Sequence, residues 1–184
     1  MLQALERLAP LPQDARSELS ALMRPLTFQA GSFLLRGGEL AESSFFVMRG
    51  LVRELYIAEN GAEHTRTFVK EGQFTGSLLD LLSGQPSVTW IQALEPTDVL
   101  VADYRAWNAL CPRYPALEHC LRRFTEELYV RKARREHDML ALSARERHDN
   151  WLAQHQDLDA RIRRQHLASY LGITPEHLSR LRRR

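Results

Sequence analysis

The pattern of apolar residues changes near Trp107, and this change constrains the fold more than any other feature of the sequence. From about Leu26 to Tyr104, short runs of β-branched and aromatic residues alternate with glycine, which is typical of a small antiparallel barrel or sandwich. After Trp107 the apolar residues recur at helical spacing to the end of the chain. The sequence therefore predicts an α+β fold in which an antiparallel β-roll precedes a helical half.

Six runs carry the β prediction. They cover residues 33–35, 45–48, 51–57, 64–69, 88–94 and 99–104. Glu59-Asn60-Gly61 separates the third run from the fourth, and Asn-Gly tolerates the positive φ angles of a tight turn, so we expect a hairpin there. Before these runs, apolar residues at helical spacing within residues 2–23, interrupted at Pro10 and Pro12, predict two short helices.

Positive charge gathers at one end of the chain. The 184 residues together carry a formal net charge of only +2. Residues 161–184 contain seven Arg and one Glu, a charge of +6, which leaves −4 for residues 1–160. Lys and Arg bind the phosphates of DNA through a salt-dependent release of counterions. The C-terminal segment is therefore the part of the chain suited to a polyanion.

Composition limits the other kinds of site. A hydrophobic content of 44% suffices for one core, or for one larger and one small domain. The two cysteines, Cys111 and Cys120, are too few for a disulfide framework or a four-thiolate cluster. No run approaches the roughly 18 apolar residues that a membrane span requires. We expect a cytoplasmic protein without metal or cofactor, and leave open a small-molecule effector of unknown identity.

A narrow apolar stripe marks a long helix, which we expect over residues 111–142. Its members are Leu117, Leu121, Phe124 and Leu128. They are spaced four, three and four residues apart, as in a coiled coil, and their flanks are charged. We therefore predict that the stripe is the dimerisation contact of a homodimer. The alternative is that it covers the edge of the β domain.

The helical half divides near Ser143. Ser143 and Glu146 have the spacing of a capping box, in which each side chain binds the backbone amide at the other position. This spacing predicts a new helix and a hinge. We therefore expect a sensor-like domain over residues 1–110, a dimerisation helix over 111–142 and a last domain over 143–184.

The last domain has the pattern of two helices joined by a tight turn. We expect the first helix from about Arg164 to Leu171, ended by Gly172 in a left-handed conformation. Thr174 then caps a second helix whose first position is Pro175, where a missing N–H costs nothing. The side chains expected to face inward are Leu167, Ala168, Leu171, Leu178 and Leu181. This is the helix-turn-helix layout, whose second helix enters the major groove of DNA.

The second helix and its cap supply the candidate DNA contacts. These are Thr174, Glu176, His177, Ser179, Arg180, Arg182, Arg183 and Arg184. Arg180 has the bidentate fork that suits guanine, and Glu176 has the acceptor that suits the amine of cytosine. The terminal arginines suit phosphates, which position a protein without specifying sequence. The alternative is a helical hairpin with a solvated basic face.

This sequence resembles the Crp/Fnr superfamily over nearly the whole chain. Residues 168–182, Ala-Ser-Tyr-Leu-Gly-Ile-Thr-Pro-Glu-His-Leu-Ser-Arg-Leu-Arg, carry the resemblance most clearly. It implies a cyclic-nucleotide-binding-like β-roll of the cupin-like jelly-roll architecture, then a long dimerisation helix and a helix-turn-helix. It also implies base reading by Glu176 and Arg180, with double-stranded DNA and RNA polymerase as partners. Cyclic-AMP-responsive members have Arg where this chain has Pro175, so their target sequence is not carried over.

The resemblance also locates a candidate effector pocket. The family's phosphate-binding cassette follows Gly-x-Phe-x-Gly-Glu-Leu, and residues 72–78 read Gly-Gln-Phe-Thr-Gly-Ser-Leu. Ser77 stands where the ribose-binding Glu would be, and Ser87-Val88 stands where Arg-Ser or Arg-Thr binds the cyclic phosphate. Loss of that Arg removes a charge-assisted contact, so we predict that cyclic AMP is not the ligand. The candidate pocket for another molecule consists of Gly76, Ser77, Leu78, Ser87 and Val88.

A cupin-like enzyme and a module that binds a protein partner are the two alternatives to a regulator. A cupin-like enzyme needs clustered histidines, and His64 is the only histidine of the β region, so we predict no catalytic or metal site. A dimeric module that binds a protein partner lacks the steep salt dependence of DNA binding. Haem sensing occurs in relatives, but Cys111 before Pro112 is typical of a structural residue, and His119 is the other ligand available.

The sequence thus predicts a homodimeric, sequence-specific, DNA-binding regulator of transcription. Its two recognition helices would lie one DNA turn apart, about 34 Å. The sequence ends at Arg184 without the hairpin wing of many relatives. We therefore expect weak DNA binding by an isolated unit and a greater dependence on dimerisation.

Overall fold

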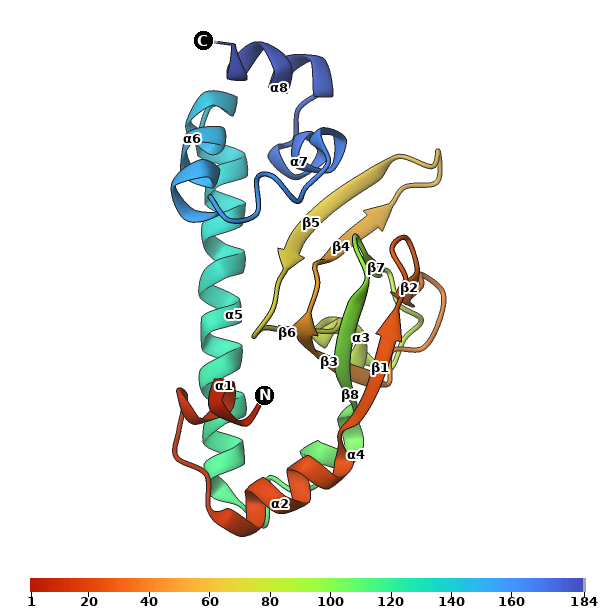
Figure 1. The fold of residues 1–184 in the computed structure, drawn as a ribbon, viewed down its shortest axis with the longest axis vertical. Helices are drawn as coiled ribbons and strands as arrows, with labels where there is room; N and C mark the ends of the chain where they lie inside the picture. Colours follow the sequence, from red (N-terminus) through yellow and green to blue (C-terminus); the bar gives the residue numbers. More distant parts are fainter. Residues whose placement is uncertain (184) are drawn as a thin grey trace.

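The computed structural model describes residues 1–183 and shows a β-roll beside one long helix, with a helical unit at one end of both (Figure 1). The helices are α1 (Leu2–Glu6), α2 (Gln13–Leu22), α3 (Leu78–Ser83), α4 (Tyr104–Asn108), α5 (Pro115–Ala141), α6 (Ala144–Gln154), α7 (Arg164–Leu171) and α8 (Pro175–Arg182). The strands are β1 (Arg24–Phe28), β2 (Phe33–Leu35), β3 (Ser43–Arg49), β4 (Val52–Ile57), β5 (Glu63–Val69), β6 (Phe74–Thr75), β7 (Trp90–Ala93) and β8 (Thr97–Asp103). Among residues 1–183, none of these helices has the length and apolar content that crossing a membrane requires.

Two antiparallel sheets form the β-roll, with strand orders β1-β8-β3-β6 and β2-β7-β4-β5. Phe45 and Val47 of β3 pair with Val101 and Val99 of β8, and all four side chains are buried in the roll. The buried core between the sheets consists of Leu35, Phe45, Val47, Val52, Val69, Ile91, Val99 and Val101. Each of the six expected runs contains or overlaps a strand, so the β-roll prediction is confirmed. Analysis of the sequence missed β1 and the two-residue β6.

The predicted hairpin joins β4 to β5. The Gly61 amide donates to the Ala58 carbonyl at 2.8 Å, and the Ala58 amide donates to the Ala62 carbonyl at 2.9 Å. Gly61 has φ of +81°, whereas Asn60 keeps negative φ and accepts a hydrogen bond from the Ala62 amide through its side chain. The hairpin is confirmed, and glycine alone supplies the left-handed residue of its turn.

The two short N-terminal helices are confirmed, and they pack on the beginning of α5 (Figure 1). Leu117 of α5 is fully buried in this cluster, and Leu121 packs against it. Phe124 meets Phe74 of β6 edge-to-face, with ring centroids 5.8 Å apart. Leu128 is half-buried. Leu117 is therefore buried within its own chain and Phe124 packs on β6, whereas the pairing of two subunits through this stripe stays a prediction.

The helical unit of α6, α7 and α8 shares its core with the β-roll. Leu51 and Phe68 of the roll lie in the same buried cluster as Trp151, Leu167 and Leu178. Phe68 meets the rings of Trp151 and Tyr170 at centroid distances of 5.4 and 5.5 Å. Burial of these apolar side chains stabilises the docked arrangement. The helical unit is thus fixed to the face of the roll beside β5.

Ser169 of α7 binds the open edge of β5, which is the last strand of its sheet. The Thr65 amide donates to the Ser169 hydroxyl at 2.8 Å, and that hydroxyl donates to the Glu63 carbonyl at 2.7 Å. One side chain therefore pairs a donor and an acceptor that no further strand satisfies. This contact aligns α7 with the roll.

Candidate nucleic-acid interface

The first helix of the predicted helix-turn-helix, α7, ends as expected. Its inward residues Leu167, Ala168 and Leu171 are buried. Gly172 follows with φ of +67°, and the Ile173 amide donates to the Ala168 carbonyl at 3.0 Å. A Cβ at Gly172 would lie 2.6 Å from the terminal methyl of Met139 on α5. The left-handed helix ending therefore favours glycine, whereas the flexible end of the Met139 side chain can move aside.

The second helix, α8, begins at the predicted cap. The Thr174 hydroxyl accepts a hydrogen bond from the His177 amide at 3.2 Å, and Pro175 occupies the first helical position. Leu178 is fully buried against α7, and Leu181 is half-buried. The helix-turn-helix geometry expected from residues 164–182 is confirmed.

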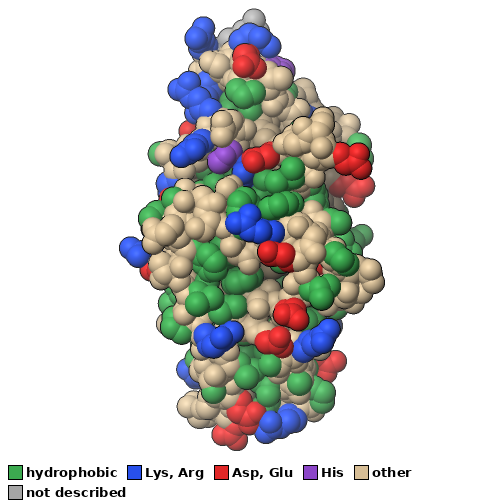
Figure 2. Space-filling view, turned by 90° about the vertical axis from the view of Figure 1, so that its right-hand side faces the viewer, with side chains coloured by type: hydrophobic (Ala, Val, Ile, Leu, Met, Phe, Trp, Pro, Cys, Tyr) green, Lys and Arg blue, Asp and Glu red, His purple; other side chains and the backbone are tan. Residues whose placement is uncertain are grey.

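The opposite face of α8 is open to solvent. Thr174, Glu176, Arg180, Arg182 and Arg183 are exposed, whereas His177 and Ser179 are half-buried. Arg184, also predicted to contact DNA, lies outside the described residues. Figure 2 shows Lys and Arg side chains gathered at this end of the molecule. An exposed basic helix face above a fixed core is the arrangement that a major groove accommodates.

Glu176 and Arg180 lie one helical turn apart on this face. The pKa of the Glu176 carboxyl is lowered, first by its hydrogen bond with its own backbone amide, then by the Thr174 hydroxyl and by the charge of Arg180. The unpaired backbone amides of the first helical turn also favour a negative charge at this position. Glu176 therefore stays ionised and able to accept hydrogen bonds.

Arg182 has a partner that analysis of the sequence did not identify. Its guanidinium forms an ion pair with Asp159, which lies in the loop before α7. Although Arg182 counts as exposed over the whole residue, its side chain is only 27% exposed and that of Asp159 only 30%. Arg182 is therefore held within the chain in this structure, and a DNA phosphate would have to replace Asp159.

Two arginines hold the end of α7 and were also missed. Arg147 of α6 donates to the Leu171 carbonyl at 3.0 Å, and Arg135 of α5 donates to the Tyr170 carbonyl and lies 4.0 Å over the Tyr170 ring. They bind helix carbonyls that have no partner within the helix. The acceptors are 24 and 35 residues away in sequence, so no local pattern marks either arginine.

His166 of α7 faces the β-roll and not the solvent. Burial, and then the charge of Arg53, lower the pKa of His166 to about 4. Arg53 is itself buried under α7, where its guanidinium donates to Glu63 and to Gln92, each at 2.7 Å. His166 is therefore neutral near pH 7, which lets it lie beside a buried cation.

The candidate effector pocket is filled by its own side chains. Ser77 and Ser87 are buried, and Gly76 and Leu78 are half-buried. The Ser87 hydroxyl donates to the buried Asp80 carboxylate at 2.5 Å, and the hydroxyls of Ser77 and Thr89 lie 3.1 Å apart. Asp80 was not anticipated from the sequence.

Val88 differs from the other residues of the candidate pocket in its exposure. It is 58% exposed in the bend before β7, between the buried Ser87 and Thr89. A hollow of about 50 Å³ lies beside α3, and Leu81 and Gly84 are among the residues that line it. Its volume suits one or two water molecules rather than a nucleotide.

The residues weighed for metal or haem lie in different surroundings. Burial raises the pKa of the Cys111 thiol, whereas His119 is exposed beside Arg122. His64 is exposed on β5. In the part of the chain that the structure describes, no three His, Cys, Asp or Glu side chains are grouped to hold a metal ion.

Comparison with known proteins relates the β-roll to a family. Residues 25–114 match the cyclic nucleotide-binding domain. The cAMP-activated global transcriptional regulator CRP of Pasteurella multocida is 29% identical over 83 residues, which are 45% of this chain and 40% of that protein. The CRP of Salmonella typhimurium is 28% identical over the same shares. The matched region spans about two fifths of the length of these curated relatives.

Solved structures share the fold over most of the chain. The CooA variant from Carboxydothermus hydrogenoformans has a TM-score of 0.73 at 20% identity, covering 90% of this chain and 77% of that one. FixK2 from Bradyrhizobium japonicum has a TM-score of 0.75 at 18% identity, covering 88% and 83%. The c-di-GMP-responsive regulator CLP of Xanthomonas campestris has a TM-score of 0.77 at 14% identity, covering 94% and 90%. Residues 25–114 therefore match a cyclic nucleotide-binding domain, and the arrangement of roll, long helix and helical unit is the fold of these solved structures.

Proposed function

We propose that the protein is a sequence-specific DNA-binding regulator of transcription that acts as a homodimer. The observation that carries this proposal is the exposed face of α8, where Glu176, Arg180 and Arg183 lie above the buried Leu178. The printed names of the curated relatives describe transcriptional regulators, and this agrees with the proposal. A partnership with RNA polymerase and a cytoplasmic location stay predictions.

Selection of fragments from random duplex DNA tests the proposal. We expect the wild type to enrich an inverted repeat, and Arg180→Ala to lose that sequence while keeping weak, salt-sensitive binding. The reason is that Arg180 suits a base edge, whereas the other arginines suit phosphates. Arg122→Ala is the matched control, because Arg122 is exposed and pairs with Glu126 on α5. It should enrich the same sequence as the wild type.

Two outcomes decide between regulator and partner-binding module. If the wild type and Arg180→Ala enrich the same DNA sequence equally, Arg180 does not read a base. Absence of DNA binding at moderate salt, with cell extract supplied as a source of effector, would overturn the DNA proposal and favour a module that binds a protein.

We further infer that cyclic AMP is not the effector. The buried carboxylate of Asp80 lies on α3, two residues after the cassette, and accepts a hydrogen bond from Ser87, which stands where the resemblance expects the phosphate-binding Arg. A phosphate would bring a second negative charge beside this carboxylate, without a cation to balance it. We expect no heat of binding when cyclic AMP is titrated into the protein at micromolar concentrations. Saturable binding would contradict the inference.

The outward face of α5 is the surface we propose for the second copy. Tyr129, Val130 and Leu140 are 72%, 45% and 81% exposed, although they are large and apolar. The continuous length of α5 offers these residues to a parallel copy of the same helix. Leu140→Asp should lower the mass measured by light scattering to that of a monomer. Leu82→Asp, at a leucine of α3 that is 67% exposed, is the control that should leave the mass unchanged.

A further inference from the structure

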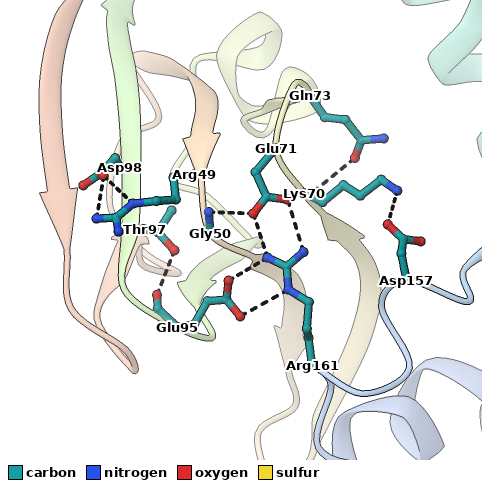
Figure 3. A network of polar contacts seen from close by, with 10 residues as sticks. All are labelled: Arg49, Gly50, Lys70, Glu71, Gln73, Glu95, Thr97, Asp98, Asp157 and Arg161. Atoms are coloured by element: carbon teal, nitrogen blue, oxygen red, sulfur yellow. Dashed lines mark hydrogen bonds and ion pairs between the residues drawn. The ribbon is translucent and has the colours of Figure 1, made fainter.

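Three turns at one end of the β-roll form an acidic platform. They are the β3–β4 turn with Gly50, the β5–β6 turn with Glu71 and the β7–β8 turn with Glu95 (Figure 3). The Gly50 amide donates to the Glu71 carboxylate at 2.9 Å, which holds that carboxylate toward the neighbouring turn. The platform thus presents two carboxylates from turns that are distant in sequence.

Arg161 lies between these two carboxylates (Figure 3). Its guanidinium donates to Glu71 at 2.8 and 3.2 Å and to Glu95 at 2.6 and 3.4 Å. The hydrogen bonds to Arg161 lower the pKa of Glu71 to about 2, and the two carboxylates raise the pKa of Arg161. Bidentate contacts of this kind fix direction as well as supplying energy.

The loop that carries Arg161, residues 155–163, is here called the latch loop. Its Asp157 forms an ion pair with Lys70, beside Glu71 on the same turn of the roll. Its Leu158 and Ile162 are buried in the core that the roll shares with the helical unit. The latch loop is therefore bound to the platform by charge on its outside and by apolar packing beneath.

The same loop also binds the recognition helix. Asp159 lies between Asp157 and Arg161 in sequence and forms an ion pair with Arg182 of α8. Alternate charged residues of one short loop thus face two different parts of the protein. Asp157 and Arg161 hold the roll, and Asp159 holds the helix whose arginines suit DNA phosphates.

We propose that the latch loop couples the β-roll to the recognition helix, with Arg161 and Asp159 as its positioning residues. This deepens the proposed function and rests on it for the role of Arg182. While the latch is closed, the position of α8 is set by the platform, and Arg182 is neutralised by Asp159. A DNA phosphate competes with Asp159 for the same guanidinium, because both are anions that accept its hydrogen bonds. Asp159 therefore restrains DNA binding.

Amide hydrogen exchange tests the coupling without DNA. Arg161→Gln should raise exchange at least about fivefold in the amides of Gly50 and of the latch loop, because charged hydrogen bonds at a partly exposed site are lost. Arg113→Gln is the matched control, since Arg113 makes a bidentate pair with Glu18 at the other end of the chain. Unchanged exchange in β3 and β8 shows that each variant keeps its fold, and Glu95→Gln serves as a milder second variant. If the amides of the latch loop exchange at the wild-type rate in both Arg161→Gln and Glu95→Gln, the coupling is overturned.

DNA affinity measured against salt tests the restraint by Asp159. Asp159→Asn should bind the selected DNA about two- to fivefold more tightly at low salt. The slope of log K against log salt should steepen by about 0.9 for each phosphate contact that Arg182 gains. Asp149→Asn removes the same charge from α6, where Asp149 neighbours Arg145, and should change little. Arg182→Ala should abolish the gain that Asp159→Asn produces.

The two experiments separate the proposals. If the wild type binds DNA and Asp159→Asn does not bind it more tightly than Asp149→Asn does, the restraint by Asp159 is overturned while the regulator proposal stands. If the wild type binds no DNA, the proposed function fails, and the coupling is then decided by hydrogen exchange alone.

Discussion

Replacing Gly50 with alanine tests the geometry of the turn on which the acidic platform depends. Gly50 has φ of +105°, a conformation that costs an L-residue roughly 1–2 kcal/mol. An added Cβ would also lie 2.5 Å from the Thr97 hydroxyl and 2.8 Å from the Pro96 carbonyl. Backbone cannot move aside as a side chain can, so overpacking adds about 1–3 kcal/mol. We expect Gly50→Ala to lower the free energy of unfolding by about 2–5 kcal/mol.

Urea unfolding monitored by tryptophan fluorescence measures this loss. Gly31→Ala is the matched control, because Gly31 has φ of +88° and no atom within 4 Å of the added Cβ. It should lose only the conformational part, roughly 1–2 kcal/mol. Equal losses in the two variants would refute the steric argument. A Gly50→Ala loss no larger than about 1 kcal/mol would refute the conformational argument as well.

Three further predictions concern the helical unit and its attachment. Leu178→Ala should lower the free energy of unfolding by about 2–5 kcal/mol in urea, because Leu178 is fully buried beneath α8. Ser143→Ala should cost about 0.5–2 kcal/mol in the same assay, because the capping box is formed. The pKa of Glu71 is lowered from 4.5 to about 2, so its contribution is present above about pH 4.5 and is lost as the pH falls toward 2. The stability difference between wild type and Glu71→Gln should therefore shrink over that range, and a constant difference would contradict the assignment.

Local patterns predicted most of the fold and of the candidate recognition helix. The β4–β5 hairpin, the capping box at Ser143, the left-handed Gly172 and the cap at Thr174 each depend on residues within a few positions of one another. Such short-range rules depend on neighbouring residues and need no knowledge of tertiary contacts. The β6 strand was missed because two residues give no alternation to detect.

Contacts between segments that are distant in the chain could not be predicted from the sequence. The apolar stripe of α5 has the spacing of a coiled coil, yet Leu117 packs on the N-terminal helices and Phe124 packs on β6. Spacing shows which side chains share a face but does not show what that face meets. The ion pairs of Asp159 and Arg161 were missed for the same reason, since their partners lie 23 to 90 residues away.

The hydroxyl of Ser169 also has a consequence for the solubility of the protein. It pairs with the Thr65 amide and the Glu63 carbonyl at the edge of β5, where a further strand would otherwise bind. An uncovered strand edge is a template for pairing with another chain. Any state in which α7 leaves the roll therefore exposes a surface prone to β-aggregation. Release of the unit of α6, α7 and α8 from the roll is thus an aggregation hazard in concentrated protein.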